Sequence, residues 1–347
     1  MQEISILRPD DWHLHVRDDV LLRTVLMASA AVFGRAIIMP NLRPPVTTAA
    51  RAAEYRQEIL AALTPGTTFT PLMTCYLTDQ TAPDDLAAGH GDGIFTAAKL
   101  YPANATTNSE HGVTDLRRIY PVLERMQKIG MPLLLHGEVT DPAVDIFDRE
   151  KVFLDRVLTG LRHDFPALRI VMEHVTTKDA VDFVRAHADD GCLAATITAH
   201  HLHLDRNAML VGGIRPHYYC LPVVKRATHR QALIAAATSG ETCFFLGTDS
   251  APHPRAAKES ACGCAGIYTA PRALPLYAEI FDRAGRLDQL EAFASRNGAR
   301  FYGLPLNQGT IRLRKTSTPA PELSCCGVDE VTPFVPPEPV FWSVAAG

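Results

Sequence analysis

Leu133-Leu134-Leu135-His136-Gly137-Glu138 is the stretch that decides the fold, because a short apolar run ends there in polar residues. A run of this length is typical of a buried strand, and amphipathic, helix-like segments flank it at residues 115–128 and 148–162. The same unit recurs along the chain. Together with 133–136, candidate strands occupy residues 12–16, 36–39, 69–75, 95–100, 170–173, 193–197 and 244–247.

Eight strands that alternate with helices predict an α/β fold in which a parallel sheet closes into a (β/α)8 TIM barrel. A doubly wound open sheet is the alternative, although no glycine-rich phosphate-binding fingerprint follows the first strand. The length suits one catalytic barrel domain over residues 1–347. From about residue 304 the helical pattern fades, so we expect 304–347 to be a short structural extension with candidate strands at 310–314 and 340–344.

Composition narrows the class of protein. A formal net charge of −4 argues against a general nucleic-acid binder, which would need a basic face to neutralise phosphates. No stretch approaches the roughly 18 uncharged apolar residues of a transmembrane helix, and the N-terminus has no signal-peptide core. The eight cysteines are too scattered for a disulfide framework. We therefore expect a cytoplasmic enzyme with reduced thiols that binds neither nucleic acid nor membrane.

The sharpest chemical signal is Asp11-Trp12-His13-Leu14-His15-Val16-Arg17. Alternate side chains of a strand share one face, so His13, His15 and Arg17 are expected to point together. The opposite face is expected to carry the apolar residues Trp12, Leu14 and Val16. Two imidazoles spaced in this way can reach one metal ion, and a pair of ordinary hydrogen-bonded histidines is the alternative.

Four later strands also end in polar groups, namely Lys99, His136, His174 and Asp249. From His15 onward the intervals are 84, 37, 38 and 75 residues, which fit three, one, one and two βα units. All five sites then lie at the carboxyl rim of the barrel, where such enzymes hold their active sites. The set suits two divalent ions, zinc foremost. A lysine beside cations has a lowered pKa and can add carbon dioxide to become a bridging carbamate, although a solvated lysine is the alternative.

This pattern resembles the amidohydrolase superfamily, and within it the compact homodimeric dihydroorotases of bacteria. The matching segments are RPDDWHLH at 8–15, IMPNL at 38–42, PLMTCY at 71–76, AKLYPANATTN at 98–108, HGEV at 136–139 and GTDSAPH at 247–253. The similarity runs from about residue 8 to 305, and the tail matches poorly. Ala199-His200-His201 departs from the Pro-Gln-His expected in the family.

The resemblance implies two Zn²⁺ per subunit, bridged by N6-carboxylated Lys99 and a hydroxide. His13 and His15 would hold one ion and His136 and His174 the other. Asp249 would bind the first ion and act as the general base. Substrate would contact Arg17, Asn41, His136 and His253, with the backbone of Leu221 and Ala265 against its ring. Thr106 and Thr107 would form the tip of a flexible loop over the site.

The implied reaction is the reversible cyclisation of N-carbamoyl-L-aspartate to L-dihydroorotate in pyrimidine (UMP) synthesis, by a homodimer acting on a small molecule. A hydantoinase or dihydropyrimidinase is the nearest alternative, because it shares the metal set but lacks the carboxylate-binding residues. An inactive, dihydroorotase-like assembly subunit is the other, although every ligand position is filled here.

Several nearby polar residues are expected to play no part in catalysis. Glu138 and Glu173 flank the ligand histidines, and we expect them to face away from the site. Cys262 and Cys264 are expected to be structural thiols. Local hydrogen bonds, not metal, are expected for His200, His201, His203 and His217.

Overall fold

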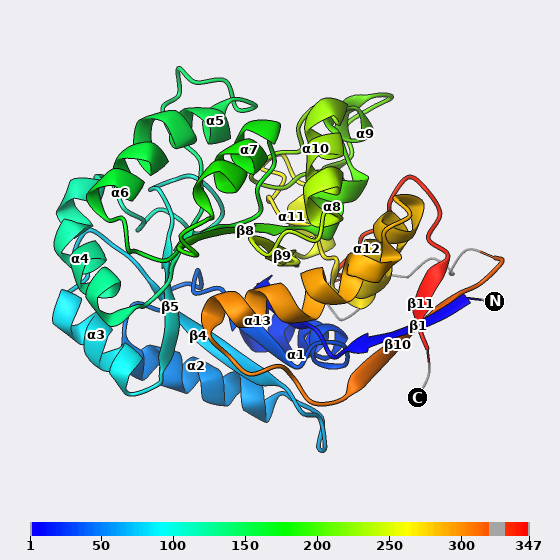
Figure 1. Cartoon of the computed structure of the whole chain (residues 1–347), viewed down its shortest axis with the longest axis horizontal. Coiled ribbons are helices and arrows are strands. Elements are labelled where there is room, and N and C mark those ends of the chain that lie inside the picture. The colour runs from blue at the N-terminus through cyan, green and yellow to red at the C-terminus, as the bar shows by residue number, and fades with distance from the viewer. Residues whose placement is uncertain (1, 319–329, 346–347) are drawn as a thin grey trace.

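The computed structural model describes residues 2–318 and 330–345. At its centre lies a parallel sheet in which eight strands pair in chain order from β2 to β9 (Figure 1). The first and last of these strands are joined by a parallel bridge between Leu14 and Ser250, which closes the predicted (β/α)8 barrel. The strands are β2 (Asp10–Leu14), β3 (Arg35–Ile38), β4 (Thr70–Tyr76), β5 (Phe95–Leu100), β6 (Leu133–Leu135), β7 (Ile170–Met172), β8 (Leu193–Ile197) and β9 (Phe244–Leu246).

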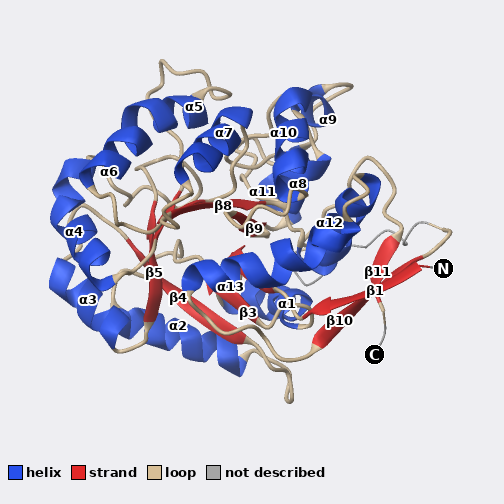
Figure 2. Cartoon of the chain, in the orientation of Figure 1, coloured by secondary structure: helices blue, strands red, loops and turns tan. Residues whose placement is uncertain are grey.

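Helices surround the strands, as Figure 2 shows. Their ends follow local sequence: the Thr177 side chain caps one helix by accepting a hydrogen bond from the Ala180 amide, and left-handed Gly130 ends another. The helices are α1 (Asp19–Ala30), α2 (Ala49–Ala61), α3 (Pro83–Gly91), α4 (Tyr120–Ile129), α5 (Arg149–Phe153), α6 (Thr159–Asp164), α7 (Lys178–His187), α8 (Ala199–His203), α9 (Arg206–Leu210), α10 (Ala227–Ala237), α11 (Arg255–Lys258), α12 (Ala273–Arg283) and α13 (Asn297–Tyr302).

A cluster of apolar side chains fills the barrel below the rim, and α13 seals its lower end. Tyr302 of α13 stacks on Trp12, with ring centroids 4.4 Å apart and planes 6° apart. The prediction that Trp12 shares a face with Leu14 and Val16 is therefore wrong. The pairing of β2 with β3 shifts register between Asp11 and Leu14, so strict alternation fails there. The cluster comprises Trp12, Ile37, Met39, Ala97, Leu134, Val171, Ala194, Phe245, Ala299 and Tyr302.

Both ends of the chain meet in a small antiparallel sheet beside the barrel (Figure 1). It contains β1 (Gln2–Leu7), β10 (Thr310–Lys315) and β11 (Trp342–Val344), with β10 in the middle. The two strands expected in the 304–347 extension are present, whereas β1 was not predicted. Residues 319–329 and 346–347 of the extension, with Cys325 and Cys326, lie outside the described residues.

Neither a disulfide nor a membrane-spanning helix is found among the described residues. Their six cysteines are all free thiols. None of their helices combines the length and apolar character that crossing a membrane requires.

Candidate metal centre and active site

Three ligand atoms converge at the carboxyl rim of β2 and β9. His13 Nε2 and His15 Nε2 lie 3.2 Å apart, and they lie 3.2 and 3.1 Å from Asp249 Oδ1. A tetrahedral ion with bonds of about 2.0–2.1 Å separates its ligand atoms by about 3.3 Å. The triangle therefore has the size of three ligands around one ion.

The remaining predicted ligands lie beside this triangle. The rings of His174 and His13 have centroids 5.0 Å apart, and those of His174 and His136 are 4.9 Å apart. Ligand atoms of His13, His174 and Asp249 all lie within 4.8 Å of one another. Buried His174 Nδ1 has no hydrogen-bond partner. Buried polar atoms are rarely left unpaired, so this nitrogen is expected to bind a group that the protein itself does not supply, such as a metal ion or a water molecule. Lys99 is fully buried in the same place.

Backbone strain accompanies these positions. Arg17, His174 and Asp249 have φ values of 58°, 42° and 43°. Side chains other than glycine rarely adopt this left-handed region, and such residues cluster at functional sites. The conformation ends strand alternation locally, which lets consecutive residues such as Glu173 and His174 both face the site.

Glu173 and Glu138 do not face away from the histidines, so that prediction is wrong. Glu173 continues the inward face of Val171; its Oε1 lies 3.1 Å from His13 Nδ1, and its Oε2 contacts Lys99 Nζ. Glu138 Oε2 lies 2.9 Å from His136 Nε2. Carboxylates that contact the far nitrogen of a histidine orient it as a metal ligand. Sequence reasoning missed both because Glu138 lies beyond the strand end and His174 breaks the alternation.

Burial and charge prepare these groups to bind cations. Burial lowers the pKa of His15 to about 4, which keeps the ring neutral. Burial would also lower the pKa of His13, but Glu173 and Asp249 raise it to about 9. The pKa of Asp249, which burial would raise, is held well below its usual range by His13 and His15. Burial lowers the pKa of Lys99 although Glu173 opposes it. At neutral pH the centre therefore carries an ionised Asp249 carboxylate and a neutral His15 ring, and an ion bound by His13 would displace the proton that this ring holds.

Predicted substrate-binding residues surround a cavity of about 20 Å³ next to the ligands. Arg17 Nη2 lies 3.1 Å from His253 Nε2, and its Nε donates to the Pro252 carbonyl over 3.1 Å. His253 Nε2 also lies 3.0 Å from the Ala265 carbonyl. The cavity lining comprises His13, His15, Arg17, Asn41, Tyr101, Thr106, Thr107, His136, His174, Leu221, Asp249, Ala251, Ala265 and Gly266.

The loop after β5 covers this cavity. Asn41 Nδ2 donates to the Thr107 carbonyl over 3.0 Å, and Thr107 Oγ1 donates to the Ala265 carbonyl over 3.3 Å. Asn108 Nδ2 donates to the Asn41 carbonyl over 2.9 Å. The enclosed volume is room for about one water molecule. This space is too small for a substrate, and the segment that carries Thr106 and Thr107 forms one of its walls.

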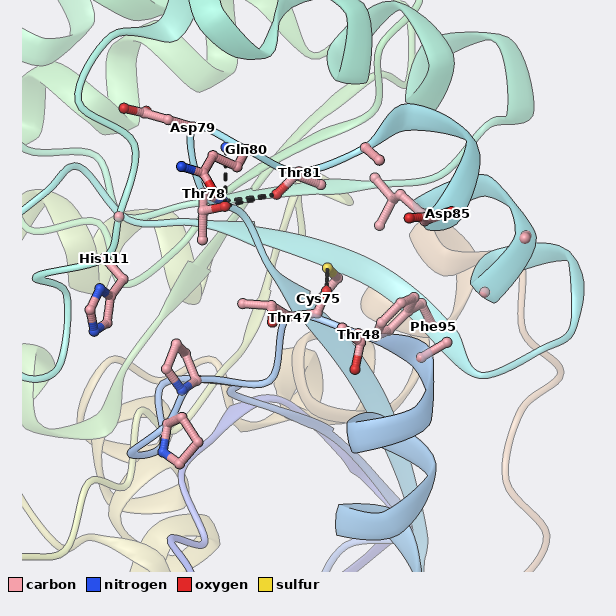
Figure 3. Close-up of a pocket in the computed structure, with 18 of the residues that line it drawn as sticks. Thr47, Thr48, Cys75, Thr78, Asp79, Gln80, Thr81, Asp85, Phe95 and His111 are labelled. Atoms are coloured by element: carbon pink, nitrogen blue, oxygen red, sulfur yellow. Dashed lines mark hydrogen bonds between the residues drawn. The ribbon is translucent and has the colours of Figure 1, made fainter.

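A larger cleft of about 930 Å³ lies elsewhere, between the start of α2 and the segments after β4 and β5 (Figure 3). It shares no lining residue with the catalytic cavity. Thr48, Cys75 and Asp85 are among its lining residues, and none of the predicted site residues lies there. No motif in the sequence indicated this cleft.

The other histidines largely form local hydrogen bonds, as predicted. His201 contacts Thr198 and the Pro222 carbonyl, His203 the Leu276 carbonyl, and His217 the Glu259 carboxylate. His200 departs from the prediction, because both of its buried ring nitrogens lack a partner and one of them lies within 4.8 Å of ligand atoms of His201 and Cys220, a group that could hold a metal ion. Cys262 is exposed and Cys264 half-buried, and neither belongs to a ligand cluster among the described residues.

Comparison with known proteins places this geometry in a family. A model of the amidohydrolase family matches residues 10–316. The dihydroorotase of Cupriavidus taiwanensis is 60% identical over 341 residues, which is 98% of each chain. The chain belongs to the dihydroorotase family. Dihydroorotase from Saccharomyces cerevisiae, solved in complex with 5-fluoroorotic acid, matches the dihydroorotase-family fold described here with a TM-score of 0.89 and 33% identity over 99% of both chains.

Hydantoinases are more distant from this member of the dihydroorotase family. The L-hydantoinase of Arthrobacter aurescens covers 99% of the chain and 83% of its own length with a TM-score of 0.79, but only 16% of residues are identical. That likeness shows a shared fold alone. Both the amidohydrolase and the dihydroorotase resemblance predicted from the motifs are confirmed.

Proposed function

We propose that the chain interconverts L-dihydroorotate and N-carbamoyl-L-aspartate by hydrolysing and reforming one cyclic amide bond, a step of pyrimidine synthesis. The observation that carries this proposal is one small cavity, lined both by His13, His15 and Asp249 and by Arg17. A guanidinium is suited to binding a carboxylate with two parallel hydrogen bonds. The yeast relative was solved with a pyrimidine carboxylic acid, which supports the same substrate class.

The metal centre in this proposal holds two Zn²⁺ ions. His13, His15 and Asp249 bind the first ion, and His136 and His174 bind the second. The triangle of ligand atoms and the unpartnered, buried His174 Nδ1 fit metal binding. When bound, the ions polarise the amide carbonyl and make water nucleophilic near neutral pH.

Carboxylated Lys99 would supply ligand oxygens to this metal centre. Its buried amine has a lowered pKa, and a neutral amine can form an N–C bond with carbon dioxide while it releases one proton. The carbamate would carry the negative charge and the oxygen ligands that a free amine lacks. Carboxylation also ends the ion pair with Glu173, which remains beside His13 to orient that ring.

Asp249 is the catalytic base. Its low pKa keeps the carboxylate ionised at neutral pH. It accepts a proton from the attacking water and gives a proton to the ring nitrogen as the C–N bond breaks. Arg17 binds the substrate carboxylate, helped by Asn41 and His253. Burial, with Arg17 nearby, lowers the pKa of His253 to about 2, so that ring is neutral and adds no second positive charge.

The backbone of Leu221 and Ala265 would support the substrate ring, and His136, which lines the same cavity, would contact the substrate. Thr106 and Thr107 close over the bound substrate and exclude water. We also propose a homodimer in the cytoplasm, as in the family that the motifs resemble. Light scattering of the purified protein at micromolar concentration tests the dimer.

Substrate preference distinguishes this proposal from its alternatives. The wild-type protein should hydrolyse dihydroorotate with a higher kcat/KM than hydantoin or dihydrouracil, which lack the carboxylate. Arg17→Met should raise the KM for dihydroorotate about 10- to 100-fold, the range for a lost charge-assisted hydrogen bond. A hydantoin turned over faster than dihydroorotate would favour a hydantoinase. Metal-loaded wild-type protein that hydrolyses neither substrate would favour an inactive subunit.

A further inference from the structure

Lys258, at the end of α11, is a buried cation that the proposed chemistry does not use. Its side chain belongs to a residue that is only 3% exposed, and among the described residues no carboxylate forms an ion pair with it. Burial lowers its pKa to about 8. Burying a charge without a counter-charge is costly unless the charge is fully hydrogen-bonded.

Three backbone carbonyls take the place of a counter-ion. Lys258 Nζ donates to the carbonyls of Tyr219, Cys264 and Gly266 over 2.8, 2.7 and 2.8 Å. An ammonium has three donors, so all of them are used. The Tyr219 carbonyl also accepts from the Gly266 amide over 3.0 Å. Lys258 therefore ties together two backbone segments that are more than 40 residues apart in the sequence.

These two segments line the catalytic cavity. Cys264 and Gly266 direct their carbonyls toward Lys258, whereas Ala265 between them directs its carbonyl toward His253 Nε2 and Thr107 Oγ1. The lysine thus fixes which way the middle peptide points. On the other segment, Leu221 follows Tyr219 by two residues and lines the same cavity.

The backbone at Gly266 is packed too closely against Ala251 for the 264–266 segment to shift toward the cavity. Its φ is 149°, and a Cβ there would meet the Ala251 carbonyl oxygen at 2.6 Å. The segment is consequently confined between Ala251 on the cavity side and the Lys258 ammonium on the other. Only a compact group with several donors can satisfy three carbonyls that converge on one point.

We propose that Lys258 is a positioning residue for substrate binding, whose ammonium holds the Leu221 and Ala265 backbone where the substrate ring rests. The inference depends on the proposed function for its substrate, but the tethering of the two segments can be measured without catalysis. Lys258 does not line the cavity, and its ammonium donates to backbone carbonyls, so its effect is exerted through backbone geometry.

Lys258→Met tests the proposal, because methionine keeps a long side chain but has no donors. We expect the KM for dihydroorotate to rise at least about 10-fold while kcat changes less than about 3-fold and metal content per chain stays the same. Hydrogen–deuterium exchange should accelerate in peptides covering residues 217–222 and 259–268 and remain unchanged in peptides covering β6 and β9.

Lys225→Met is the matched control. Lys225 is also buried, at 4% exposed, but its Nζ donates to the Val223 carbonyl and not to the 264–266 segment. Its replacement should change KM less than about 3-fold and leave exchange at 259–268 unaltered. If Lys258→Met does not accumulate as folded protein, Lys258→Arg decides, since it keeps the charge but its planar fork cannot serve three converging carbonyls. The same local change in exchange, with a smaller rise in KM, is then expected.

Unchanged KM and unchanged local exchange in the Lys258 variant would overturn the inference, and so would faster exchange spread evenly over the barrel. A wild-type protein that does not turn over dihydroorotate would refute the proposed function instead. In that case the exchange measurement still decides whether Lys258 tethers the two segments.

Discussion

Glu173 contacts two of the proposed metal ligands at once, Lys99 and His13. A carboxylate at the far nitrogen of a ligand histidine fixes the ring and raises its basicity, and loss of such a partner typically lowers metal affinity 10- to 100-fold, as a rough range. We expect Glu173→Gln to weaken zinc binding by about this factor. Competition with a chromogenic chelator measures the change.

Glu259→Gln is the control for this substitution, because Glu259 also lies 3.0 Å from a histidine nitrogen, that of His217, but away from the site. Its zinc affinity should equal that of the wild type. Equal affinities in all three proteins would show that Glu173 does not orient His13.

The side-chain directions of rim residues were predictable wherever regular strand alternation continues to the end of the strand. Lys99 and His136 follow this rule, because residues two apart on a strand face the same way. Glu173 and His174 do not, since a left-handed φ of 42° at His174 brings consecutive side chains to one side. Local sequence carries no sign of this conformation, which the surrounding structure imposes.

Closure of the loop after β5 depends on few contacts, one of which is the hydrogen bond from Thr107 Oγ1 to the Ala265 carbonyl. A hydrogen bond of this kind contributes about 0.5–1.5 kcal/mol, or about 2- to 10-fold in an equilibrium. Thr107→Ala should therefore lower kcat/KM for dihydroorotate about 2- to 10-fold in steady-state assays. Thr114→Ala, whose hydroxyl contacts Asp79 instead, should not. Equal losses in both variants would contradict a specific closing contact.

The packing of α13 beneath the barrel predicts that a glycine-to-alanine substitution in this helix destabilises the protein, although such substitutions usually stabilise helices. Gly→Ala inside a helix usually stabilises by about 0.5–1 kcal/mol, but a Cβ at Gly298 would overlap Trp12 Nε1. Overpacking of a core costs about 1–3 kcal/mol, so Gly298→Ala should lower the free energy of unfolding. Gly160→Ala in α6, where nothing lies within 4 Å, should raise it. Denaturant titration measures both, and a stabilised Gly298 variant would contradict the packing.

The buried strands of the barrel were predictable from the sequence, whereas the exposed strand β1 was not. All eight barrel strands were expected within two residues of their positions, because strands buried on both faces are continuous apolar runs. By contrast β1, with the sequence QEISIL, is mostly exposed, and its partner β10 lies about 300 residues further along the chain. Nothing near β1 in the sequence indicates that pairing.

At the scale of the whole molecule, the barrel brings His15 and Asp249 to within 3.1 Å although 234 residues separate them in the sequence. Closure between β2 and β9 makes this possible, with the Asp249 amide donating to the His13 carbonyl over 2.9 Å. The proposed chemistry requires this closed rim, where Glu173 joins Lys99 to His13. The proposed mechanism therefore depends on a pair of metal ions held together by carboxylated Lys99.

Counting metal in the wild type and in Lys99→Ala by mass spectrometry, together with dihydroorotate turnover, tests this claim most directly. We expect about two zinc ions per wild-type chain, about one in the variant, and turnover reduced at least about 100-fold, since both the bridge and the second ion are lost. A variant that keeps both ions and wild-type turnover would contradict the account.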